Sequence, residues 1–175
     1  MEFSMKVTRL SLMALVAALT VMPIARAHHS FSMYDGTQTV VHTGVVVRVN
    51  PDANHMQVFF APLNDQHTGV IKGADGKPEV WMVEMGTAAA EARMGLTVQT
   101  FPPGTIFSVG AFPGRADPHI SSRLNWGLYS CPPKTPPAPG KYCDSVPGSV
   151  AYGPGVLPKP GKLEKEVKPD YRPAP

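Results

Sequence analysis

Charged side chains are scarce in this chain of 175 residues, because they make up 17% of it against about 25% in an average soluble domain. The formal net charge is only +3, and the sequence has no basic run of the kind that marks a nucleic-acid surface. We therefore expect no nucleic-acid partner. The composition also lacks the Ala, Glu, Lys and Leu content of a long coiled coil.

Cysteine is nearly absent, since Cys131 and Cys143 are the only two and form neither a CxxC nor a CxxCH motif. These missing spacings exclude a thioredoxin-type redox site and a covalent c-type haem. The sequence also lacks a phosphate-cradling glycine loop before a helix and a G-x-S-x-G motif. We therefore expect no bound nucleotide and no ordinary hydrolase chemistry.

The longest hydrophobic run, residues 10–24, has 15 residues and is too short to cross a bilayer core of about 30 Å. Lys6 and Arg9 precede it, and Ala25-Arg26-Ala27 follows it. This pattern predicts a secretory signal over residues 1–27, cleaved after Ala27. The mature protein is then nearly neutral, periplasmic or secreted, and without a stable membrane span.

Proline is unevenly distributed, because 12 of the 20 prolines follow Cys131. Such a segment cannot form a strand ladder or a long helix, so residues 131–175 are predicted to be a largely irregular, extended tail that is a spacer or wraps the domain. In an oxidising compartment, Cys131 and Cys143 are expected to form a structural disulfide that closes a short loop. The folded domain is then expected over residues 28–130.

Within that domain, alternating apolar and polar residues predict five short strands, over residues 39–50, 55–61, 79–85, 105–112 and 123–130. One helix is predicted over residues 87–94, with Thr87 as its N-cap and Gly95 after its end. Five strands with one helix between the third and the fourth favour a mainly β fold, a small OB-fold-like Greek-key barrel. An open antiparallel sandwich of the same strands is the alternative.

Several short motifs are distinctive, above all His28-His29-Ser30-Phe31 after the cleavage point and the strand pattern Trp81-x-x-Glu84-x-Gly86. With Thr43-Gly44-Val45-Val46 and the segment 109–113, they make the chain resemble a family of small exported bacterial proteins, the domain of unknown function 6152. The resemblance covers roughly residues 24–115. It implies an exported, β-rich, periplasmic protein and no established activity.

Cleavage after Ala27 makes His28 the first residue of the mature protein. Its α-amine and its Nδ1 can chelate one copper ion, because amine and imidazole nitrogens suit Cu(II) and the α-amine gives up its proton near neutral pH. His29 offers an alternative mode through a deprotonated backbone amide. A remote histidine would complete the site, and the candidates are His55, His42 and His119, with His55 at the start of a strand favoured.

Glu84 places a carboxylate inside an apolar strand, where it can be a metal ligand or can orient a ligating histidine. An ion pair with Arg93 or Arg48 is the alternative. Trp81 in the same strand is a candidate binding residue that core packing also explains. We expect Trp81, Val83 and Met85 to point inward.

These features favour a non-enzymatic protein that binds a small ligand, a metal ion or an envelope protein, with copper as the preferred metal. A second hypothesis is a copper-dependent redox or electron-transfer accessory protein that uses His28. A third is a structural subunit that docks onto an envelope complex through its proline-rich tail.

Overall fold

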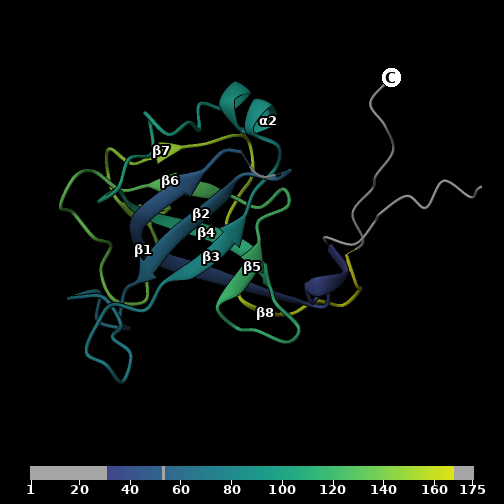
Figure 1. Cartoon of the computed structure of the whole chain (residues 1–175), viewed down its shortest axis with the longest axis horizontal. Coiled ribbons are helices and arrows are strands. Elements are labelled where there is room, and N and C mark those ends of the chain that lie inside the picture. The colour runs from purple at the N-terminus through teal and green to yellow at the C-terminus, as the bar shows by residue number, and fades with distance from the viewer. Residues whose placement is uncertain (1–30, 53, 168–175) are drawn as a thin grey trace, which may run out of the picture.

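Five strands close into a small barrel in the computed structural model, which describes residues 31–52 and 54–167. The predicted signal, residues 1–27, lies outside this range. The elements in chain order are η1 (Phe31–Met33), β1 (Gln38–Asn50), β2 (Gln57–Pro62), β3 (Trp81–Glu84), α2 (Ala88–Arg93), β4 (Ile106–Pro113), β5 (Ile120–Ser122), β6 (Leu128–Ser130), η2 (Cys143–Ser145), β7 (Val150–Ala151) and β8 (Gly161–Lys162) (Figure 1).

The barrel runs in the order β1-β2-β3-β5-β4 and closes where β4 pairs with β1. All of its neighbouring strands are antiparallel except β3 and β5, which are parallel. Helix α2 follows the third strand and precedes the fourth. The prediction of a mainly β, OB-fold-like barrel of five strands with one helix at this point is confirmed.

Strand β1 reaches both neighbours because it is long and bent. A bulge separates Val46 from Arg48 in the register with β2, and Val46 is buried while Val47 is 42% exposed. At Gly44, a Cβ would lie 2.5 Å from the Phe60 ring and 2.7 Å from the Ala61 carbonyl oxygen, so only glycine fits. The interior face of β1 is therefore the one that carries Val46 and, nearer its start, His42.

The helix lies at one end of the barrel (Figure 1). The Thr87 hydroxyl accepts a hydrogen bond from the Ala90 amide, as expected of an N-cap. Beyond the helix, Leu96 and Phe101 are fully buried in the core. Val83 and Met85 are buried there as well, and Trp81 packs against the same cluster, so the predicted inward face of β3 is confirmed.

The predicted fifth strand is wrong in position. The fifth strand of the barrel is β5, which ends before the predicted range 123–130 begins. Only the last part of the predicted range is a strand, β6, which pairs with β4. The residues between them form a turn in which Leu124 has a φ of 50° and the Trp126 amide bonds to the Arg123 carbonyl. Leu124, Trp126 and Leu128 alternate with other residues as in a strand, although the backbone forms a turn at Arg123–Trp126.

The proline-rich tail wraps the barrel. The prediction that it forms no strand ladder is wrong, because β7 pairs with β6, and β8 pairs with the start of β1. Each ladder is two residues long, so it fits between the prolines. Further along, the Val167 amide donates to the Gly36 carbonyl. The described tail is thus irregular but bound along its length.

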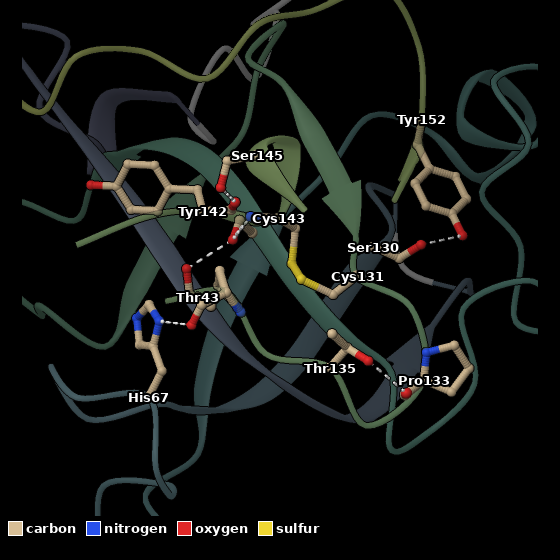
Figure 2. The surroundings of a disulfide bond; sticks show 12 residues. Thr43, His67, Ser130, Cys131, Pro133, Thr135, Tyr142, Cys143, Ser145 and Tyr152 are labelled. Atoms are coloured by element: carbon tan, nitrogen blue, oxygen red, sulfur yellow. Dashed lines mark hydrogen bonds between the residues drawn. A yellow bond between two sulfur atoms is a disulfide. The ribbon is translucent and has the colours of Figure 1, made fainter. Parts of the chain in front are cut away.

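The predicted disulfide between Cys131 and Cys143 is present and spans 12 residues (Figure 2). It joins the end of β6 to η2. The Cys143 amide donates to the Ser108 hydroxyl, which shares a hydrogen bond with Thr43 on β1. Tail, β4 and β1 are therefore tied at one point. No helix in the described residues is long and apolar enough to cross a membrane.

A buried ion pair joins the helix to the turn after β5. The Arg123 Nη1 lies 2.7 Å from the Glu91 Oε2, and the two side chains are 2% and 1% exposed. The other Glu91 oxygen accepts from the Gly86 amide. Arg123 also donates to the carbonyls of Trp126 and Tyr152. Every charge in this cluster is hydrogen-bonded, which offsets the cost of its desolvation.

Replacing Arg123 with Leu leaves the Glu91 carboxylate buried without its cation. We expect Arg123→Leu to lower the free energy of unfolding by about 3–5 kcal/mol in urea titrations. The exposed Arg93, in the same helix as Glu91, is the matched control. Arg93→Leu should change the free energy of unfolding by less than about 0.5 kcal/mol. The double variant E91L/R123L should be more stable than R123L. Equal effects of R123L and R93L would contradict this role.

Candidate functional site

His55 and Glu84, both predicted as site residues, lie side by side. His55 is in the loop before β2, and Glu84 ends β3, opposite Gln57 in the β2–β3 register. The His55 Nδ1 is 3.6 Å from the Glu84 Oε1 and 3.2 Å from the Met85 carbonyl oxygen. Antiparallel pairing of β2 and β3 thus brings together an imidazole and a carboxylate that are 29 residues apart.

The alternative ion pairs for Glu84 do not form. The Arg48 guanidinium carbon instead lies 3.4 Å from the centre of the Phe59 ring, which is a cation–π contact. Arg93 is exposed at the end of α2. Within the described residues, neither arginine contacts the Glu84 carboxylate.

A small cavity of about 140 Å³ opens beside this pair. Phe31 from η1 and Leu124 and Asn125 from the turn after β5 line it together with His55 and Glu84. The Phe31 ring packs edge-on against Phe112, 5.4 Å between centroids. We call these five lining residues the His55–Glu84 cleft.

Tyr34 completes the polar group and was missed as a site residue. Its ring is 1% exposed. Burial raises the pKa of the Tyr34 hydroxyl, and the negative charge of Glu84 raises it further. Burial likewise raises the pKa of Glu84, while His55 and Tyr34 act in the opposite direction. Its place in the sequence, three residues after Phe31, is a signal that points to it.

The other candidates gather around Trp81, away from the cleft. The indole ring lies 5.4 Å from the imidazole of His42 on one strand and 5.4 Å from that of His119 in the loop before β5. The indole Nε1 donates to Glu79, and His119 bonds to Asp117. His42 and His119 are therefore not brought to Glu84, and His55 is the one of the three that is.

Of the expected metal ligands His28, His29 and His55, only His55 lies in the part of the chain that the structure describes. His28 and His29 precede the described range, so the structure gives no position for them. In residues 31–52 and 54–167, no group of three or more His, Cys, Asp or Glu side chains could hold a metal ion.

Comparison with known proteins gives one match, to a protein-family model over residues 15–121. Its description is "Family of unknown function (DUF6152)", and the match covers more than half of the chain. Neither the search of curated proteins nor the search of solved structures finds a match.

His42 should respond to pH through folding stability. Burial lowers its pKa to about 4, whereas a histidine in the unfolded chain titrates near 6.5. Between these values the unfolded state binds more protons, so the free energy of unfolding should fall as the pH drops from 6.5 toward 4.

Urea unfolding of the wild type and of His42→Leu across this range measures the effect, because other titrating groups cancel in the difference. The variant should lose less stability on acidification. An NMR titration of the His42 ring with a midpoint near 6.5 would contradict the expectation.

Proposed function

The chain belongs to the family of unknown function DUF6152, and we propose that it is an exported barrel protein that binds copper. The ligands would be the mature amino terminus at His28 and the imidazole of His55. The observation that carries the proposal is the position of Phe31, which lines the same cavity as His55 and Glu84.

The predicted mature amino terminus is close in sequence to Phe31, which lines the cleft. Only two residues separate His28 from Phe31, and each residue of extended chain spans at most about 3.6 Å. His28 therefore lies no more than about 11 Å along the chain from a wall of the cleft. Its α-amine and Nδ1 supply two nitrogens, and a deprotonated amide of His29 is the alternative donor.

The His55 ring is held in a way that suits a metal ligand. Its Nδ1 points at the Met85 carbonyl, 3.2 Å away. A proton on Nδ1 leaves the lone pair of Nε2 for a metal, as in many histidine sites whose second nitrogen is bonded to protein. The Glu84 carboxylate, 3.6 Å from Nδ1, would offset part of the charge of a bound cation.

Export rests on the sequence, and the disulfide supports it, because such bonds persist in oxidising compartments. The proposal is of a binding protein located in the periplasm or secreted. A copper-dependent redox or electron-transfer accessory role would use the same ligands. A structural subunit that docks onto an envelope complex through its tail would not need the copper site.

A Cu(II) titration of the protein with a native His28 amino terminus tests the proposal. We expect binding in the micromolar range or tighter, and its loss when one alanine precedes His28, because the chelating amine is then displaced. His55→Gln should weaken binding by about tenfold or more.

His119→Gln is the matched control, since His119 lies beside Trp81 instead of in the cleft. It should bind copper like the wild type. Equal affinity of the native and the alanine-extended proteins would overturn the role of His28. Equal affinity of His55→Gln and His119→Gln would overturn the role of His55.

A further inference from the structure

The barrel wall has an opening on the β2 side of β1. On that side, β8 pairs with Gln38 and Thr39, and β2 pairs from Gly44 onward. Val41, His42 and Thr43, which lie between these pairings, line a cavity of about 440 Å³. The loop after β2 and residues 140–142 of the tail form its other walls. We call this cavity the barrel mouth.

The mouth has the size and the lining of a small-molecule site. Cavities of roughly 300–1,000 Å³ with a few convergent polar groups typically hold small ligands, and barrel mouths are a frequent location. The lining includes two aromatic, two imidazole and two charged side chains, from Trp81, Tyr142, His42, His67, Asp65 and Lys141. In Figure 2, Tyr142, Thr43 and His67 lie on one side of the disulfide.

His42 has unused hydrogen-bonding capacity. Its ring lies on the interior face of β1 against Phe60 and Trp81. In the part of the chain that the structure describes, neither ring nitrogen makes a hydrogen bond. Because burial lowers its pKa to about 4, the imidazole is neutral at ordinary pH and offers one donor and one acceptor.

His67 adds a second fixed imidazole. Its Nδ1 lies 3.0 Å from the Pro137 carbonyl oxygen. This contact holds the ring and does not involve Nε2. Its backbone has a φ of 53°, a conformation that is unfavourable for a residue with a side chain and often found at functional sites.

The charged side chains at the mouth do not favour a charged ligand. Asp65 and Lys141 are exposed and have opposite signs, so neither an anion nor a cation finds an excess of countercharge. The aromatic surfaces of Trp81 and Tyr142 favour a ligand with a flat apolar face. The neutral imidazole of His42 favours groups that both donate and accept hydrogen bonds, as hydroxyl groups do.

We propose that the barrel mouth binds a neutral saccharide of one or two rings. One face of a sugar ring would pack on Trp81, and its hydroxyls would bond to His42 and His67. This site lies apart from the His55–Glu84 cleft and shares no lining residue with it, so it does not depend on the copper proposal.

Tryptophan fluorescence can report the binding directly. The protein has two tryptophans, and Trp126→Phe leaves Trp81 as the only one. We expect glucose, N-acetylglucosamine or maltose to change its emission saturably, at millimolar concentration or below. Glucuronate and adenosine serve as a charged and an aromatic probe.

Variants locate the site by calorimetric titration with the saccharide that binds best. His42→Leu should weaken binding by about tenfold, since it removes two hydrogen-bonding atoms. His42→Gln keeps a donor and an acceptor and should bind more tightly than His42→Leu. Tyr142→Ala, in the tail, should weaken binding without touching the core.

His119→Gln is the matched control, because His119 contacts the same indole but does not line the mouth. It should keep the wild-type affinity. Circular dichroism checks that each variant folds, and Cu(II) affinity should be the same in all of them. The proposal is overturned if none of the three sugars binds, if only glucuronate or adenosine binds, or if His42→Leu and Tyr142→Ala both bind like the wild type.

Discussion

The buried pair of Arg123 and Glu91 is the contact on which the rest of the molecule depends. Its hydrogen bonds reach the backbone at Gly86 before the helix, at Trp126 in the turn after β5, and at Tyr152 in the tail. Because unpaired charges in an interior are very costly, these three segments can only fold together. A barrel whose fifth strand has three residues needs such a tie.

The backbone at Arg123 also helps to form one wall of the His55–Glu84 cleft. The Arg123 amide donates to the Glu84 carbonyl, which fixes the end of β3 against the turn. Leu124 and Asn125 follow at once and line the cavity. Leu124 adopts its left-handed conformation where Arg123 is anchored on one side and Trp126 on the other. Scaffold and site are therefore built from one hydrogen-bonded unit.

Sequence patterns located β1 to β4 and the helix because each carries a strong local signal, such as the valines of β1 or the Thr87 cap. They failed at β5, where three residues between two loops show no periodicity, and in the turn, where alternating apolar residues belong to no strand. They named His55 and Glu84 as candidates, since imidazole and carboxylate groups can be recognised from residue type alone. Their adjacency, and the mouth around His42, arise from pairing between distant segments, which local patterns do not report.

Strand β8 has a consequence for the order of assembly. Thr39 at the start of β1 binds backbone that lies 120 residues later in the chain, and proteins are made from the amino end. Strand β1 is therefore synthesised first, but its edge at Gln38 and Thr39 is covered only after β8, late in the chain, has been made. Contacts this distant in sequence slow folding, and an open edge invites pairing with other chains. Pro158 and Pro160, just before β8, donate no backbone hydrogen bonds and so limit the pairing of this late-arriving segment with other strands.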